Sequence, residues 1–168
     1  MKTSILKYGG YGFLTGAIVF LLALTLGKNL DFSTQEIIGY LTIFVSLSFV
    51  YFGIKHYRNE INNGSVSFVK ALIIGVLIST IVGLGIAIVD YLYTSVINPD
   101  FRTEFFAKSV ENLESNFTGA ELETKKEELK AQMELYSGSY FMAFIMFVTV
   151  FLIGFIISLI SALVLQKK

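Results

Sequence analysis

The sequence predicts an all-α integral membrane protein: a four-helix bundle with an extracytoplasmic two-helix hairpin between its third and fourth membrane helices. Of the 168 residues, 54% are hydrophobic and only 15% are charged, whereas soluble proteins average about 25% charged residues. Four stretches are apolar over the roughly 20 residues that a helix needs to cross a bilayer. Most acidic residues gather between the third and fourth stretches. We therefore expect residues 1–168 to form a single membrane domain.

Composition also narrows the function. The chain has no cysteine and one histidine, so it offers no disulfide, no thiolate site and no metal site built on several imidazoles. Its formal net charge is zero, which gives nucleic acid no attractive field. No phosphate-binding loop, zinc-protease, serine-hydrolase or calcium-loop motif occurs. We therefore expect no enzymatic activity, no catalytic residue, no cofactor or metal site and no nucleic-acid partner.

The first two apolar stretches predict membrane helices over residues 8–27 and 37–54. The first, Tyr8–Gly27, is longer than the apolar segment of about 7–15 residues in a signal peptide, and no A-x-A cleavage pattern follows it. We expect it to remain as an uncleaved first helix. The second, Ile37–Ile54, ends where a group of basic residues begins.

The last two apolar stretches predict membrane helices over residues 68–97 and 139–165. Between Leu72 and Ile88 the only polar side chains are Ser79 and Thr80. A core helix of a soluble protein would carry a polar face at helical spacing. The third stretch therefore indicates a helix surrounded by lipid and by other membrane helices.

The distribution of Lys and Arg predicts the orientation. Four spans put both termini, and the turn between the second and third spans, on one side of the membrane. That side collects Lys2, Lys7, Lys55, Arg58, Lys70, Lys167 and Lys168. The turn between the first two spans has Lys28 alone against Asp31 and Glu36. Because short cytoplasmic loops are enriched in Lys and Arg, we expect both termini in the cytoplasm.

The turn between the second and third spans is a polar island that holds the single histidine. Lys55, His56 and Arg58 follow the second span, and Asn63-Gly64 is a turn dipeptide because both residues tolerate positive φ. Anchoring at the lipid headgroups explains these charges. The alternative is a functional site in which His56 carries a proton or binds a ligand.

Asp90 is the one acidic residue attached to a span, and an ionisable residue in a membrane helix is a functional candidate. A helix that starts at Phe68 and rises about 1.5 Å per residue places Asp90 about 33 Å further along, at the outer interface. The same level is expected to hold an aromatic belt of Tyr91, Tyr93, Tyr136 and Tyr140. We expect Asp90 to be an interfacial anchor, with a functional role as the alternative.

Small residues recur along the spans and predict close helix packing, because membrane helices associate mainly by packing and hydrogen bonds. Residues four apart form stripes: Gly12 and Gly16; Gly75, Ser79 and Gly83; Gly154, Ser158 and Ala162. The second span has Gly39, Thr42 and Ser46 at mixed spacing. Internal packing and the seam of a homo-oligomer both fit these stripes, and we favour internal packing.

Residues 98–137 predict a helical hairpin outside the membrane. Asn98-Pro99 is expected to start its first helix, and Thr118–Glu121, a capping-box pattern, its second. Each helix has an apolar stripe: Phe106, Val110, Leu113 and Phe117; Leu122, Leu129, Met133 and Tyr136. Three arrangements fit these stripes: they face each other, they lie on the membrane surface, or they bind a partner. We favour the arrangement in which they face each other. We expect an acidic head that stands off the membrane and binds another membrane or envelope protein.

Several motifs resemble those of the bacterial membrane proteins grouped as domain-of-unknown-function family 4199. They are K-Y-G at Lys7–Gly9, E-I-I-G-Y at Glu36–Tyr40, F-G-I-K-x-Y-R at Phe52–Arg58, N-G-x-V-S-F-x-K-A at Asn63–Ala71 and G-x-I-I-S-L-I-S-A-L at Gly154–Leu163. Many members carry a proline before the last motif, whereas Leu152 occupies that region here. The resemblance implies a four-helix protein of a bacterial cytoplasmic (inner) membrane and brings no known activity.

We expect the protein to be a non-enzymatic accessory or structural membrane component. The alternative is a small transporter or channel subunit, which should show polar groups repeating along one helix face at membrane depth. The polar groups expected at that depth are small and neutral: Ser46, Ser48, Ser79, Thr80, Thr149 and Ser158. This pattern favours packing over conduction.

Overall fold

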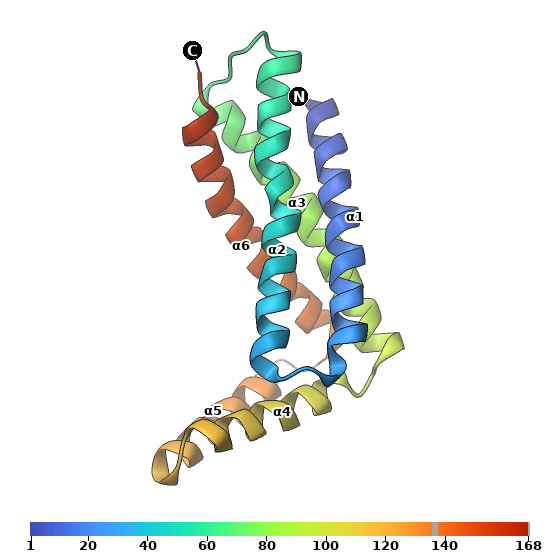
Figure 1. Cartoon of the computed structure of the whole chain (residues 1–168), viewed down its shortest axis with the longest axis vertical. Coiled ribbons are helices and arrows are strands. Elements are labelled where there is room, and N and C mark those ends of the chain that lie inside the picture. The colour runs from blue at the N-terminus through green and yellow to red at the C-terminus, as the bar shows by residue number, and fades with distance from the viewer. Residues whose placement is uncertain (136–137, 168) are drawn as a thin grey trace.

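The structure is a computed structural model that describes residues 1–135 and 138–167, and this part of the chain is all-α (Figure 1). It contains six α-helices: α1 (Lys2–Leu26), α2 (Phe32–His56), α3 (Phe68–Leu92), α4 (Phe101–Asn116), α5 (Gly119–Leu135) and α6 (Ser139–Leu165). A 3-10 turn, Gly27–Asn29, follows α1, and π-helical turns, Tyr57–Ile61 and Tyr93–Ile97, extend α2 and α3. The predicted fold class is confirmed.

Four helical segments are long and apolar enough to cross a membrane: Lys2–Leu26, Ser33–Ile61, Phe68–Ile97 and Ser139–Leu165. The third and fourth have the predicted bounds. The first two begin earlier than predicted, and the second also ends later. Apolar runs mark only the part of a helix that lies in hydrocarbon, and the backbone hydrogen bonds of α1 and α2 continue beyond it into polar sequence.

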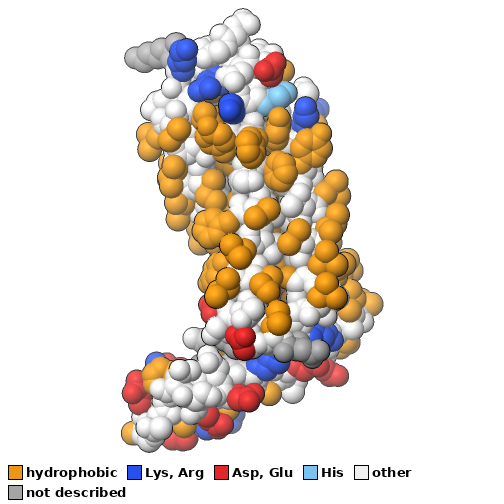
Figure 2. All heavy atoms as spheres, in the orientation of Figure 1, with side chains coloured by type: hydrophobic (Ala, Val, Ile, Leu, Met, Phe, Trp, Pro, Cys, Tyr) orange, Lys and Arg blue, Asp and Glu red, His pale blue; other side chains and the backbone are white. Residues whose placement is uncertain are grey.

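The helix α3 lies at the centre of the bundle. It packs against α1, α2 and α6, and its interface with α6 is the most extensive. One face of α3 is fully buried along its length through Ile74, Ile78, Val82 and Ile86. The other spans turn large apolar side chains outward, and these form a broad hydrophobic band around the middle of the molecule (Figure 2). This band is the surface that lipid tails would cover.

The interface between α3 and α6 is built from two Gly-x-x-x-Ser segments that face each other. A Cβ atom added at Gly75 would lie 2.7 Å from the Cβ atom of Ser158, and one added at Gly154 would lie 2.5 Å from the Cβ atom of Ser79. Real Cβ atoms do not approach this closely. The two serine hydroxyl oxygens lie 3.3 Å apart. We call these four residues the glycine–serine seam.

A second set of glycines packs α1 into the bundle. Cβ atoms added at Gly9 and Gly12 would lie 2.7 and 2.5 Å from side-chain atoms of Ile81 and Val82 on α3. The predicted stripes on α1, α3 and α6 therefore pack against one another inside one chain, as we favoured. Gly39 differs, because a Cβ atom there would have no neighbour within 4 Å.

The two ends of the bundle differ in charge. Both termini and the turn between α2 and α3 lie at one end, whereas the turn after α1 and the α4–α5 pair lie at the other (Figure 1). At the end that holds the termini, the visible charged side chains are mainly Lys and Arg, whereas the other end shows Lys and Arg mixed with acidic side chains (Figure 2). Acidic side chains gather over the α4–α5 pair (Figure 2). The residues predicted to share a side of the membrane thus share an end of the molecule.

The α4–α5 hairpin lies across the end of the bundle instead of standing away from it (Figure 1). The ring of Phe101 packs edge-on against Tyr93, with centroids 5.5 Å apart, and the Lys108 ammonium donates to the Lys28 carbonyl oxygen at 2.5 Å. Asn98 does not cap α4: its side-chain amide donates to the Glu104 carboxylate at 2.8 Å, and its backbone N–H donates to the Tyr93 carbonyl oxygen at 2.7 Å. The helix begins instead at Phe101, after Asp100.

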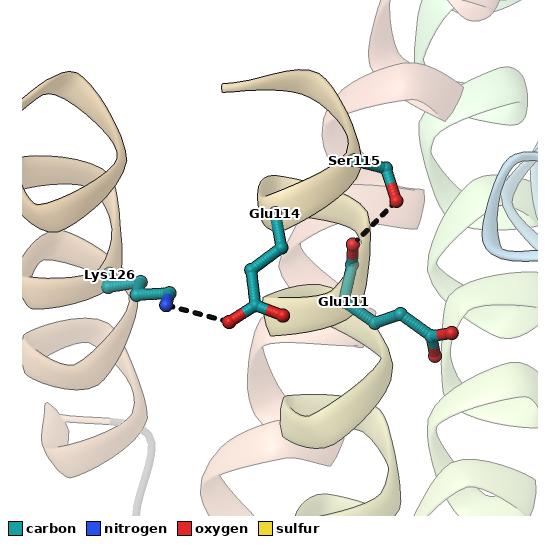
Figure 3. Close-up of polar contacts among 4 residues, drawn as sticks. All are labelled: Glu111, Glu114, Ser115 and Lys126. Carbon is teal, nitrogen blue, oxygen red and sulfur yellow. Dashed lines mark hydrogen bonds and ion pairs between the residues drawn. The ribbon is translucent and has the colours of Figure 1, made fainter. Parts of the chain in front are cut away.

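Within the hairpin α4 and α5 face each other, but the predicted stripes meet only in part, because Met133 lines the cavity at the end of the bundle instead. Leu113 and Leu129 line one cleft between them. The Lys126 ammonium pairs with the Glu114 carboxylate at 2.7 Å across the two helices (Figure 3), and this hydrogen bond raises the pKa of Lys126. Such an exposed pair adds little stability. Tyr136, the last member of the second predicted stripe, lies outside the described residues.

The glycine–serine seam predicts a specific sensitivity to one added methyl group. Gly154→Ala forces its Cβ atom against Ser79 and Leu47, and we expect it to lower the stability of the bundle by about 1–3 kcal/mol, as overpacking does in protein cores. The melting midpoint in detergent, followed by circular dichroism, measures the effect. Gly39→Ala is the matched control on α2 and should cause no loss. Equal midpoints for the two variants would contradict the seam.

Candidate functional site

The described residues place polar groups at both ends of the bundle, and the turn between α2 and α3 is the first candidate. Asn63 and Gly64 adopt positive φ values of 51° and 81°, which is the conformation that an Asn-Gly turn favours. The Gly64 backbone N–H donates to the Arg58 carbonyl oxygen at 2.8 Å. Ser67 then caps α3 by accepting the Lys70 backbone N–H at 3.4 Å. The chain reverses here as the sequence predicted.

This turn is fastened to the end of α6. Val66 and Lys167 form a two-way backbone bridge, with N···O distances of 2.8 and 2.9 Å. The Arg58 guanidinium donates to the Leu165 carbonyl oxygen at 3.3 Å, near the end of α6. Val66 is buried beneath the bridge. The F-G-I-K-x-Y-R and N-G-x-V-S-F motifs thus supply backbone and side-chain hydrogen bonds that join the turn after α2 to the end of α6.

The three basic candidates of this turn reach different places. His56 lies beside α1, with its Nδ1 atom 3.0 Å from the Ser4 hydroxyl oxygen and its ring 5.2 Å from that of Tyr8. Arg58 contacts the end of α6, and Lys55 is exposed. The structure does not bring these side chains together around one ligand position. Their contacts indicate anchoring and helix packing.

The second candidate is a cavity of about 350 Å³ at the opposite end, between the spans and the hairpin. Five helices besides α3 contribute to its wall, and α3 contributes Asp90. The lining residues are Phe20, Glu36, Gly39, Tyr40, Ile43, Asp90, Phe101, Arg102, Phe105, Met133, Met142, Ile145, Met146 and Thr149. Most are apolar or aromatic, which is the usual character of a small-molecule site.

Asp90, predicted at the level of the outer interface, is buried within the protein near the end of α3. Its residue surface is 4% exposed, and its Oδ2 atom has no hydrogen-bond partner among the described residues. The predicted depth along α3 agrees with its place at the hairpin end. The burial of Asp90 could not be predicted from the sequence, because a periodic pattern within α3 carries no information about which segments lie over it.

Two other charged side chains line the cavity. Glu36 on α2 is exposed, and Arg102 on α4 is half-buried. The Arg102 guanidinium donates to the Met133 carbonyl oxygen and so joins α4 to α5. In the described part of the chain Arg102 and Asp90 form no ion pair. The Asp90 carboxylate therefore faces a mostly apolar cavity without a local counterion.

The aromatic belt predicted around Asp90 is present only in part. Tyr140 is exposed and its ring lies 4.6 Å from that of Tyr91. Tyr93 is fully buried instead, and its hydroxyl donates to the Leu24 carbonyl oxygen at 3.0 Å. Tyr136 lies outside the described residues. Tyr93 therefore packs α1, α3 and α4 together and does not face the headgroups.

Sequence patterns missed most of the cavity because its wall is assembled from distant segments. One available signal was the E-I-I-G-Y motif: Glu36, Gly39 and Tyr40 all line the cavity. Methionine use was another. Of the four methionines, Met133, Met142 and Met146 line it.

Comparisons with known proteins give one match. A family model described as "Protein of unknown function (DUF4199)" matches residues 7–167, nearly the whole chain. No curated protein and no solved structure matches the chain.

The exposed Asp31 and the buried Asp90 should respond oppositely to loss of charge. Asp90→Asn removes an unpartnered carboxylate that is costly to bury, so we expect an unchanged or higher melting midpoint in detergent without added ligand. Asp31 caps α2 by accepting the Thr34 hydroxyl and backbone N–H at 2.7 and 2.8 Å, contacts that lower its pKa. Asp31→Ala should cost about 1 kcal/mol. A loss of about 2 kcal/mol or more for Asp90→Asn would indicate a satisfied buried bond.

Proposed function

Because the chain belongs to the DUF4199 family of proteins of unknown function, we propose its role from its geometry: a non-enzymatic accessory or structural component of a bacterial cytoplasmic membrane. The termini face the cytoplasm and the hairpin faces outward. The protein is a multi-pass membrane protein with four candidate spans. The observation that carries the proposal is that hydroxyl groups buried in the middle of the bundle form hydrogen bonds within their own helices and do not line a channel.

Four buried hydroxyl groups in the middle of the bundle donate hydrogen bonds within their own helices. Thr42 donates to the Ile38 carbonyl oxygen at 2.8 Å, and Ser46 donates to the Thr42 carbonyl oxygen at 2.7 Å. Ser79 and Ser158 likewise donate to the glycine carbonyl oxygens one turn earlier, at 2.9 and 2.6 Å. A conducting path needs polar groups that face a lumen. These hydroxyls serve helix packing, which supports a structural role.

The placement of ionisable groups supports a non-enzymatic role. The single histidine, His56, lies at the end that holds the termini, whereas Asp90 lies at the hairpin end. General acid–base catalysis needs such groups within hydrogen-bond reach of one substrate. The length of the bundle separates these two, so His56 cannot act on a substrate held beside Asp90 and Glu36.

The alternative is a small transporter or channel subunit, and the observation that favours it is the buried Asp90 carboxylate. Below the cavity, however, Leu47, Val82 and Val150 are fully buried and close the bundle. A path through them would require the helices to separate. Flux of ions or solutes into liposomes that contain the purified protein, above that of protein-free liposomes, would support this alternative.

The hairpin is the part of the molecule best suited to a protein partner. Between Asp100 and Glu134 it carries nine acidic and five basic residues, a difference of four negative charges. This charge disfavours anionic lipid headgroups and favours a basic surface on another membrane or envelope protein. Because α4 packs against the end of the bundle, such a partner would be held close to the extracytoplasmic surface of the cytoplasmic membrane.

A photocrosslinking amino acid at the exposed Thr124 of α5 tests the accessory role. In cells that express the full-length protein, we expect adducts of discrete mass with another protein. The triple variant Glu123→Gln, Glu127→Gln and Glu128→Gln should reduce their yield several-fold, because it removes three exposed charges from the contact surface. Glu60→Gln, at the opposite end, is the matched control. Adducts that persist unchanged in the triple variant, or no adduct at all, would contradict the proposal.

A further inference from the structure

We propose that the cavity between the spans and the hairpin binds an amphiphilic amine, with the ammonium group held by Asp90 and the apolar body held by the cavity wall. This inference concerns a ligand site and does not depend on the accessory role. It rests on three features of the described residues: the wall of the cavity, the charge balance of its lining and the missing partner of Asp90.

The wall suits an apolar body of variable shape. Its volume of about 350 Å³ lies within the range of about 300–1,000 Å³ that is usual for ligand pockets. Phe20 and Ile43 are buried and form rigid wall, while Met133, Met142 and Met146 come from α5 and α6. Methionine side chains are flexible and polarizable and adapt to different apolar ligands. The wall therefore favours hydrophobic ligands without requiring one particular ligand shape.

The charges of the lining select for a cation. The lining has two acidic side chains, Asp90 and Glu36, and one basic side chain, Arg102. The Arg102 guanidinium donates to the Met133 carbonyl oxygen. An anionic ligand would meet two carboxylates and only one guanidinium. A ligand with one positive charge would balance the lining.

The buried Asp90 carboxylate selects for a cation that can donate a hydrogen bond. Its Oδ2 atom lacks a partner among the described residues, and a buried charge is costly unless it is paired and hydrogen-bonded. A primary or secondary ammonium group supplies both the charge and the N–H donor. A quaternary ammonium supplies no N–H, and an alcohol supplies no charge.

A bare metal ion fits this site poorly. Calcium and magnesium need about six or more oxygen ligands. The described residues contain no group of three or more His, Cys, Asp or Glu side chains that could hold a metal ion. An amine needs only one carboxylate and an apolar wall, which the cavity supplies.

The cavity is accessible from the surface of the bundle. Tyr40 on α2 is 49% exposed and Ile145 on α6 is 37% exposed, and both line the cavity. The opening therefore includes side chains of the outward faces of α2 and α6. A membrane-dissolved amphiphile can reach it with its apolar body still in lipid.

Photolabelling in lipid nanodiscs tests the site. The full-length protein is placed in zwitterionic phosphatidylcholine discs and irradiated with a long-chain primary alkylamine that carries a mid-chain diazirine. Peptide mass spectrometry should find adducts at Ile43, Met142 and Met146. Asp90→Asn should reduce these adducts about tenfold or more, because a charge-assisted hydrogen bond is lost. Glu60→Gln removes one exposed acidic charge at the opposite end of the bundle and should leave them unchanged.

A second variant separates cavity binding from any effect of Asp90→Asn on folding. A Cβ atom at Gly39 would have no neighbour within 4 Å, and Gly39 lines the cavity, so Gly39→Leu can fill it without a clash. This variant retains Asp90 and should also lose the cavity adducts. Adducts at lipid-facing positions such as Leu84 should persist in both variants.

Three results would overturn the proposal. Equal cavity labelling in the wild type and in Asp90→Asn would show that the carboxylate does not recognise the amine. Labelling by a neutral alcohol of the same chain length and diazirine position, as strong as that by the amine, would show that lipid-like chains fill the cavity. Full labelling of Ile43, Met142 and Met146 in Gly39→Leu would show that these adducts do not depend on an open cavity. Each result leaves the proposed accessory role, which the hairpin crosslinking tests, unaffected.

Discussion

The glycine–serine seam between α3 and α6 is the constraint on which the rest of the structure depends. Lipid tails are as apolar as leucine, so burial of hydrophobic side chains gives membrane helices little reason to associate. Close backbone approach and short polar contacts must supply the attraction instead. Gly75 and Gly154 permit that approach, and Ser79 and Ser158 occupy the space that each opposing glycine leaves. With α3 fixed on α6, the glycines of α1 pack against Ile81, Val82 and Ile86 of α3.

The central position of α3 determines the chemistry at both ends of the molecule. At the hairpin end, the last turns of α3 bring Asp90 under the hairpin and Tyr93 under α1. At the other end, the turn that precedes α3 is tied to α6 through Val66 and Lys167. The two helices that form the seam are therefore also joined at the end of the bundle that holds the termini. The glycine–serine seam and the Val66–Lys167 bridge together fix α3 against α6. The outward faces of α2 and α6 remain open to lipid.

The sequence was sufficient for features that depend on local pattern. The uniform apolarity of Phe68–Ile97 predicted a span with the bounds that the structure has, and Asn63-Gly64 predicted the turn. The burial of Asp90 and Tyr93 was not predictable in this way, because it depends on which segments cover the end of α3. The cavity was also missed, since its wall joins residues such as Phe20 and Met133 that are distant in the sequence. Local hydropathy describes depth in the membrane and carries little information about which helix face meets a neighbour.

The most direct test of the account is an intramolecular disulfide across the seam. The chain has no cysteine, and the hydroxyl oxygens of Ser79 and Ser158 are 3.3 Å apart. The double variant Ser79→Cys and Ser158→Cys, oxidised in membranes with a lipid-permeable catalyst, should lose both free thiols while its mass remains that of a monomer. A disulfide-linked dimer would show that the seam joins two chains. Two persistent free thiols would show that α3 and α6 do not meet at these residues.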